Sequence, residues 1–231
     1  MKKLLSFVII LFLQAQNHAS AQDSLKKDHR IYFMLNIGAS LNNVAGSKID
    51  HTQYWNDQSG IGKVTWSQAT SIAASIQIEK LVSTRFFLKS GLGFVQKQAV
   101  IDNTVWIQKD HLKTGYLYIP VLIGFNIYPR AKAFNVWFEL GPSFNFAIIK
   151  KSYNTDAEIK TTPVTTSVAI ATGLKYTIAP NVRLTFSYMY VHDLNAANTQ
   201  QLSLSTYDPT REYDFKFRSH LVMVGVAFQK H

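Results

Sequence analysis

The sequence predicts an all-β protein: an eight-stranded antiparallel up-and-down transmembrane β-barrel. Three observations predict this fold. Eight segments alternate apolar residues with small or polar ones at every second position, which is the pattern of a β-strand. Charged residues make up only 16% of the chain, whereas soluble domains carry roughly 25%. The connections between the segments alternate between short and long. Together these features indicate strands that face something other than water.

A secretory signal peptide is predicted for residues 1–21. It has a basic start at Lys2 and Lys3, an apolar run over Leu4–Leu13, and a small-x-small cleavage site ending at Ala21. The apolar run is shorter than the roughly 20 residues of a spanning helix, although an uncleaved anchor is the alternative. A short periplasmic tail (residues 22–30) and the barrel (residues 31–231) follow.

Cleavage before Gln22 removes two of the 24 basic residues, which leaves 22 against 14 acidic ones and lowers the net charge from +10 to +8. In an exported protein this balance favours anionic lipid headgroups or a polyanionic cell surface as neighbours, and not nucleic acid. The chain has no cysteine, which excludes a disulfide framework, a thiolate metal site and lipid attachment to cysteine.

The eight strands follow one another along the mature chain. They are expected at Ile31–Asn42, Thr65–Glu79, Thr84–Gln98, Tyr116–Tyr128, Phe134–Ile149, Val164–Thr177, Val182–His192 and Phe215–Gln229. Several are a dozen residues long or more, whereas strands of soluble proteins average five or six and a tilted membrane strand needs about 9–11.

Each strand has one apolar face. In the first four strands it is formed by every second residue of Ile31–Leu41, Ile72–Ile78 and Leu117–Ile127, and by Phe86, Leu88, Leu92 and Phe94. In the last four it is formed by every second residue of Val136–Leu140, Phe144–Ile148, Val182–Tyr188 and Val222–Phe228, and by Val168, Ile170, Leu174 and Tyr176. In the final strand Phe215 and Phe217 are out of phase with this face, so we expect a bulge near Ser219–Leu221.

The apolar faces are expected to point outward. The opposite faces carry small and polar residues with isolated charges, which suits the interior of a membrane barrel whose apolar face contacts lipid. The alternative is a secreted lipocalin-like cup with its apolar faces inward. Because the chain is exported and has no apolar run long enough for a later spanning helix, we place it in the outer membrane of a Gram-negative bacterium.

The connections support the same topology. Those after the second, fourth and sixth strands are "KLVST", "PRAKA" and "IAPN", whereas those after the odd-numbered strands are long and polar. Tight periplasmic turns and extended outer loops are typical of an up-and-down barrel, and closure leaves no exposed sheet edge.

The segments "YLYIPVLIGFNIY" and "VWFELGPSFNF" resemble the fourth and fifth strands of the PorT-type outer-membrane β-barrel family of Bacteroidetes-like bacteria. The Ile119-Pro120 and Glu139-x-Gly141-Pro142 elements match; Tyr118 replaces a frequent Glu, and Asn145 a frequent Gly. The resemblance covers the barrel in outline and is specific mainly over residues 116–146. It implies an outer-membrane barrel and, because founding members are associated with secretion, secretion-machinery proteins as partners.

Two prolines fall within predicted strands. Folding the hairpin back about Ala131 brings Pro120 close to Gly141 and Pro142. Because each proline removes a backbone donor, we expect a bulge or kink confined to this level of the barrel.

Polar residues on the inner faces predict a filled lumen, because eight-stranded barrels are packed with side chains. A buried carboxylate requires a partner, so Glu139 is expected to pair with Lys89, or with Lys175 or Arg183 if the register shifts. We interpret these four residues as a structural network; a proton or solute relay is the alternative.

No catalytic or metal-binding motif is present, and we expect no cofactor and no enzymatic activity. His192 and Asp193 are adjacent, so on a strand they point to opposite faces, and a solvated loop pair is the favoured interpretation. His51, His111 and His220 lack metal-ligand spacing.

Aromatic residues in the long outer loops suit contact with an extracellular protein or glycan, or packing over the barrel mouth; they are Tyr54, Trp55, Trp106 and Tyr207. The sequence thus favours a non-enzymatic barrel with surface-contact loops. An accessory role in secretion and a small lipid-acting enzyme using His192 are the alternatives.

Overall fold

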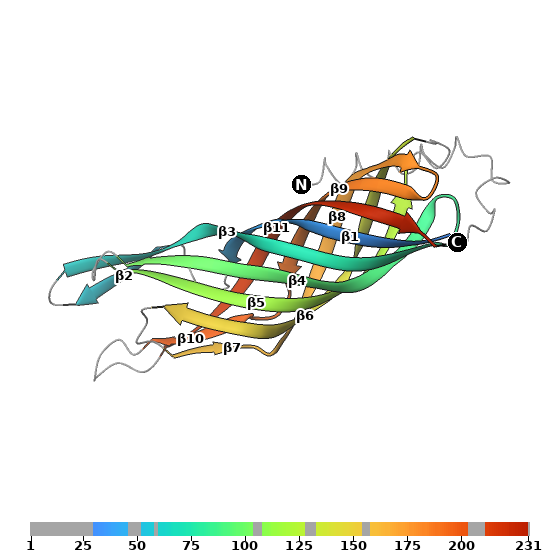
Figure 1. Ribbon diagram of the computed structural model, residues 1–231. Coiled ribbons are helices and arrows are strands. Elements are labelled where there is room, and N and C mark those ends of the chain that lie inside the picture. The colour runs from blue at the N-terminus through green and yellow to red at the C-terminus, as the bar shows by residue number, and fades with distance from the viewer. Residues whose placement is uncertain are drawn as a thin grey trace, which may run out of the picture.

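The computed structural model describes residues 30–45, 52–57, 60–103, 108–127, 133–153, 158–202 and 211–230 (Figure 1). Eight long antiparallel strands form a closed barrel because β1 pairs with both β3 and β11. They are β1 (Ile31–Ala45), β3 (Gly60–Leu81), β4 (Phe86–Asn103), β5 (Gln108–Asn126), β6 (Phe134–Tyr153), β8 (Val164–Ala179), β9 (Val182–Asp193) and β11 (Arg211–Gln229). The predicted fold class is therefore confirmed. The described residues include no helix long and apolar enough to cross a membrane.

Three short strands extend the sheet at the end away from the C-terminus (Figure 1). The strand β2 (Thr52–Asp57) pairs with β3, and β10 (Asn198–Leu202) pairs with both β11 and β7 (Glu158–Thr161). All three segments were expected to be loops. Their residues lack a sustained apolar alternation, because beyond the membrane neither face of a strand has to match hydrocarbon.

The ends of the long strands differ in how well the sequence predicts them. At the periplasmic end every boundary lies within two residues of its expected place, for example Phe86 instead of Thr84. At the outer end several strands continue further, and β5 begins at Gln108 instead of Tyr116. The predicted signal peptide and the tail up to residue 29 lie outside the described residues.

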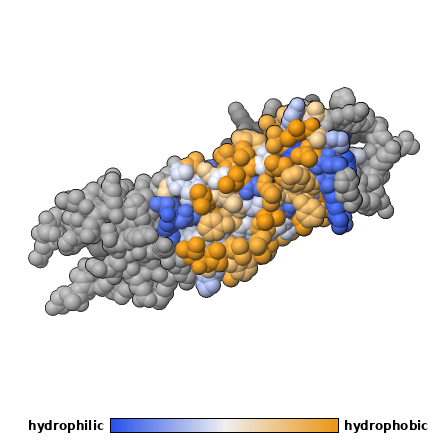
Figure 2. Space-filling view, in the orientation of Figure 1, coloured by the Kyte–Doolittle hydropathy of each residue, from blue (hydrophilic) through white to orange (hydrophobic). Residues whose placement is uncertain are grey.

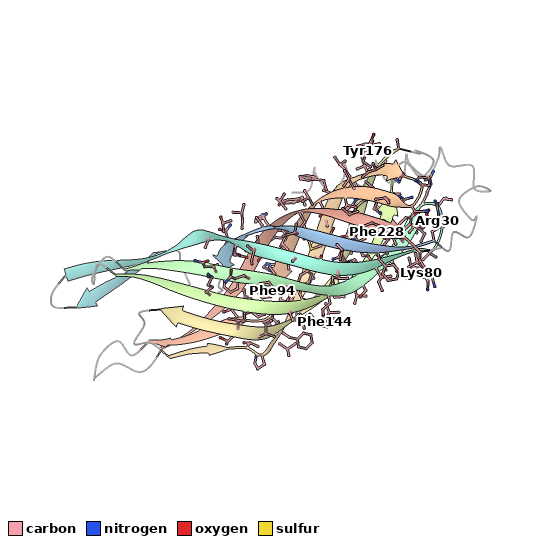
Figure 3. The ribbon with its side chains drawn as sticks, viewed as in Figure 1. Arg30, Lys80, Phe94, Phe144, Tyr176 and Phe228 are labelled. Carbon is pink, nitrogen blue, oxygen red and sulfur yellow. The ribbon has the colours of Figure 1, made fainter. Side chains whose placement is uncertain are left out.

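The apolar faces point outward, as predicted. Ile123 is 61% exposed, Leu140 63% and Val224 54%, although all three are aliphatic. Figure 2 shows the result as a hydrophobic belt bounded by hydrophilic residues at both ends. Phe94 and Phe144 lie on this outer surface, and Arg30 and Lys80 lie at the periplasmic end (Figure 3). Such a belt fits hydrocarbon and excludes the cup interpretation, which needs these residues inside.

Of the bulge or kink expected at the prolines, the bulge is not observed, and the kink stays a prediction. Pro120 pairs with Ser143 and Ile123 with Leu140, so the register between β5 and β6 is the same on both sides of the prolines. Only the two intervening positions lack ladder partners, because proline has no N–H to donate. The register shift in this hairpin lies between Gly115 and Tyr116 instead, and further shifts lie in the β3–β4 and β8–β9 pairs.

The expected bulge in β11 is also wrong. Its register with β1 and with β9 runs unbroken through Ser219–Leu221. Phe217 keeps the inward phase of its strand and is fully buried in the lumen. The narrow interior of an eight-stranded barrel accepts large aromatic side chains as filling, so no change of phase is needed.

Candidate functional site: a layered polar plug in the lumen

Two ion pairs form the lower layer of the lumen, which we call the lower plug. Nζ of Lys89 on β4 lies 2.5 Å from Oε2 of Glu139 on β6. Nζ of Lys175 on β8 donates to both carboxylate oxygens of Glu79 on β3, each at 2.7 Å. The four side chains are buried, and their formal charges sum to zero. A neutral set of paired charges avoids the large cost of an isolated buried ion.

The Lys175–Glu79 pair joins opposite walls of the barrel. In the closed order β1-β3-β4-β5-β6-β8-β9-β11, strand β3 stands four places from β8, which is half of the circumference. The pair therefore crosses the lumen, whereas Lys89 and Glu139 lie only two strands apart. An ion pair of this kind ties the two walls together and fills the space between them.

Two aromatic rings complete the lower plug. Phe87 and Trp137 meet edge to face with their ring centroids 6.3 Å apart. Nζ of Lys89 lies 4.3 Å from the Trp137 ring centroid, and Nζ of Lys175 lies 4.1 Å from that of Phe87. Each lysine thus has a carboxylate and a π-face as neighbours, and both contacts favour the charged amine.

Glycines make room for these rings. Trp137 is paired across the strands with Gly173, where a Cβ would lie 2.6 Å from Cζ2 of the indole. Phe87 is paired with Gly124, where a Cβ would lie 2.1 Å from Cζ of the ring. Any larger residue at either position would displace the aromatic side chain, so each glycine and its opposite ring form one packing unit.

A third ion pair lies nearer the outer end, in what we call the upper plug. Nζ of Lys97 on β4 lies 2.6 Å from Oδ1 of Asp193 on β9. Ser167 donates to the same oxygen at 2.7 Å, and the backbone N–H of Phe217 donates to Oδ2 at 3.2 Å. Strands β4 and β9 also stand four places apart, so this pair crosses the lumen as well.

Amide and hydroxyl side chains extend the upper plug around the wall. Asn42 donates to Ser71 at 2.8 Å and accepts from Ser219 at 2.8 Å. Asn145 donates to Ser167 at 2.7 Å and so connects to Asp193. Beside this network lies a cavity of about 10 Å³, close to the volume that one water molecule requires.

The structure brings together three of the four residues proposed for the lumen network. Lys89, Glu139 and Lys175 lie in the lower plug. Arg183 does not join them, because its guanidinium carbon lies 4.1 Å above the ring of Tyr32. Gly141 and both prolines lie on neighbouring strands at one level, and at Gly141 a Cβ would lie 2.1 Å from the carbonyl oxygen of Val121.

Sequence reasoning missed two carboxylates. Glu79 lies on the same inward face of its strand as Ser71, Ser75 and Gln77. This alternation is the sequence signal that places Glu79 in the lumen. Asp193 is not the solvated loop residue that we expected, because β9 includes it and buries it in the lumen. As predicted, it points away from its neighbour His192.

The described histidines lie apart from any group of metal ligands. No group of three potential metal ligands is found among the described residues. The side chains of His51 and His111 lie outside the described residues, as do the loop aromatics Tyr54, Trp55, Trp106 and Tyr207. His192 and His220, by contrast, meet Tyr190 on the outer surface of the barrel, with ring centroids 6.5 Å and 5.2 Å from it.

The outward apolar belt and the neutral polar filling together define an integral β-barrel of the outer membrane of a Gram-negative bacterium. Comparison with known families agrees. The sequence matches the family described as "Outer membrane protein beta-barrel domain" over residues 14–197, and the chain belongs to this family.

Several solved structures are similar to the chain at low sequence identity. The outer membrane protein OprG from Pseudomonas aeruginosa has a TM-score of 0.60 and 8% identity, covering 90% of this chain and 99% of OprG. AlkL has a TM-score of 0.48 and 11% identity, covering 88% of this chain and 91% of AlkL. Neisserial surface protein A has a TM-score of 0.45 and 11% identity, covering 86% of this chain and 96% of that protein. No curated protein sequence matches the chain.

Proposed function

We propose that this protein is a non-enzymatic, non-conducting barrel that presents an extracellular β-sheet platform to a protein or glycan ligand. The observation that carries the proposal is strand length. The strands β3, β4, β5, β6 and β11 have 22, 18, 19, 20 and 19 residues, whereas about 9–11 suffice to cross the membrane. The excess lies at the outer end, where β2, β7 and β10 widen the sheet (Figure 1).

Regular strands outside the membrane favour a contact role. A loop needed only to close the barrel mouth does not require hydrogen-bonded strands that project beyond it. A platform of paired strands holds its side chains at fixed spacing, which lowers the conformational cost of binding a partner. The aromatic residues of the outer segments, such as Trp55 and Trp106, are of the kind that dominates binding surfaces.

The plug supports the non-conducting part of the proposal. Lys175–Glu79 and Lys97–Asp193 cross the lumen at two levels, and Phe87 and Trp137 fill the space beside the lower pair. An ion would have to displace several buried, mutually paired side chains to pass. In planar lipid bilayers the full-length protein is therefore expected to give no conductance steps, and regular steps would contradict this part.

Binding by the platform is tested on a glycan array and on immobilised extracellular-matrix proteins. The probe is the fluorescently labelled full-length barrel in detergent. Replacing residues 52–57 by a Gly-Ser segment of equal length is expected to reduce binding strongly. A matched control replaces residues 128–132, in a periplasmic connection, in the same way and is expected to bind normally. Binding that survives the outer replacement, or no binding by the wild type, would overturn the proposal.

The PorT-type resemblance supports a second candidate, an accessory role in protein secretion. The resemblance includes Glu139, which the lower plug pairs with Lys89, and Gly141 two residues further on. Deleting the protein and profiling the culture supernatant distinguishes the two roles. Loss of a set of secreted proteins from the supernatant supports the secretion role. An unchanged profile of secreted proteins contradicts the secretion role and favours the platform role.

The enzymatic alternative predicts that His192 is required. Asp193 faces the lumen and pairs with Lys97, so it is not placed to assist His192 on the outer surface. Under our proposal the substitution His192→Ala leaves the lipid composition of the outer membrane unchanged. A change in lipid acylation in that strain would favour a lipid-acting enzyme.

A further inference from the structure

A cluster of basic and aromatic side chains lies on the outer surface of β9 and β11. We call it the rim patch; it consists of Tyr188, Tyr190 and His192 on β9 and Lys216, Arg218 and His220 on β11. Their neighbours along the chain, such as Met189, Asp193 and Phe217, are buried in the lumen. Because side chains alternate between the faces of a strand, the rim patch faces away from the barrel.

The members of the rim patch are held together by pairing and contacts. Arg218 stands directly opposite His192, and His220 directly opposite Tyr190. The hydroxyl of Tyr188 lies 2.6 Å from Nδ1 of His220. Nζ of Lys216 donates to the carbonyl oxygen of Leu194 at 2.7 Å, which anchors the amine and leaves its other donors available.

The rim patch lies at the outer boundary of the apolar belt. Below His220 the outward face of β11 is formed by Val222, Val224, Val226 and Phe228. The distance from Phe228 to Arg218 is ten residues, or about 33 Å along the strand and about 25 Å along the membrane normal at a tilt of about 40°. The belt of such barrels is about 25 Å tall, so the patch reaches the level of the outer headgroups.

The charge of the patch is not neutralised by the described part of the chain. The acidic residues whose side chains the structure describes are Glu79, Glu139 and Asp193, and all three are buried in the lumen. Arg218 is exposed and offers a planar fork of donors that matches the oxygens of a phosphate. This fork complements an external anion at the headgroup level.

We infer that the rim patch binds the phosphate group of a phosphorylated glycolipid of the outer leaflet. Arg218 takes two phosphate oxygens, Lys216 approaches the same group, and the acyl chains lie along the column from Val222 to Phe228 below. The paired Tyr188 and His220 present polar edges to the sugar. The partner is a lipid and not a free anion, because the apolar column continues directly beneath the cations. This inference is independent of the ligand of the extracellular platform.

The test measures retention of lipid by the full-length barrel during detergent exchange, followed by native mass spectrometry. The probes are lipopolysaccharide, the same lipopolysaccharide after enzymatic dephosphorylation, and inorganic phosphate as competitor. The variant is Lys216→Gln with Arg218→Gln. The control is Lys80→Gln with Lys230→Gln, which removes the same charge from exposed positions at the periplasmic rim.

The wild type and the control are expected to retain the phosphorylated lipid. The rim variant is expected to retain at most about one tenth as much, because two charge-assisted contacts are lost. Heat-modifiable gel migration shows that all variants are folded. Equal retention of the dephosphorylated lipid would overturn the inference, as would full retention by the rim variant. Displacement by millimolar inorganic phosphate would show a free-anion site and overturn the assignment to lipid.

Discussion

Charged side chains are neutralised differently on the inner and outer faces of the same strands. Inside the barrel, each of the three described carboxylates has a lysine within 2.7 Å. On the outside, the described charges are basic, as at Arg30, Lys80 and Arg218, and they lie at the ends of the apolar belt. The lumen is filled by buried side chains, so the chain has to supply its own counter-charges there, whereas at the rims water and lipid phosphates supply them.

This comparison predicts how the two faces respond to substitution. A change that leaves an unpaired charge in the lumen should be costly, because no solvent replaces the lost partner. A change of charge at the rim should have little effect on stability. A charge in the middle of the outer belt should also be costly, because hydrocarbon supplies no counter-charge.

The largest effect is expected from Lys175→Met, which leaves Glu79 buried without its lysine. Breaking a buried pair in this way typically costs about 3–5 kcal/mol. The measurement is urea unfolding of the barrel in phosphocholine vesicles, followed by tryptophan fluorescence. The matched control, Lys175→Met with Glu79→Leu, removes both charges and should recover most of the loss. If single and double variants are equally destabilised, packing volume and not charge pairing explains the plug.

A smaller loss is expected from Ile123→Lys, which places a charge in the belt. Lysine near the bilayer midplane of a membrane barrel costs about 2–4 kcal/mol. The same unfolding measurement applies, with Ile123→Leu as the control that keeps the side chain apolar. An unchanged free energy of unfolding for the lysine variant would mean that this part of the belt does not contact hydrocarbon.

Next in size is Gly173→Ala, which tests packing in the lower plug. The added Cβ would lie 2.6 Å from the indole of Trp137 and 2.3 Å from the carbonyl oxygen of Phe186. Overpacking of this kind costs about 1–3 kcal/mol. Combining it with Trp137→Phe should relieve part of the crowding, so the two losses should not add. Strict additivity would show that the ring and the glycine do not form one packing unit.

The smallest effect on stability is expected from Arg218→Gln in the rim patch. Surface substitutions of this kind usually change the free energy of unfolding by no more than about 0.5 kcal/mol. The measurement is again unfolding in phosphocholine vesicles, which lack phosphorylated glycolipid. A loss as large as that of Lys175→Met would mean that Arg218 has an internal partner, contrary to the contrast between the two faces.

The sequence by itself determined the barrel, its strand number and the direction of its faces. These properties follow from an alternation of period two, which holds wherever one side of a strand contacts hydrocarbon and the other a packed interior. The periplasmic boundaries were predictable for the same reason, since the apolar alternation ends there at short turns. The similar depths of Lys89 and Glu139 along their strands were enough to suggest their pairing.

Only the tertiary structure decided which strands face each other across the lumen. The pairs Lys175–Glu79 and Lys97–Asp193 depend on closure and on register shifts in the β3–β4, β5–β6 and β8–β9 pairs, and no local pattern encodes the sum of these shifts. The rim patch likewise depends on register, because Arg218 and His192 are 26 residues apart in the chain and meet only when β9 and β11 pair. Local alternation sets the face on which a side chain lies, whereas closure of the barrel sets the partner that it meets.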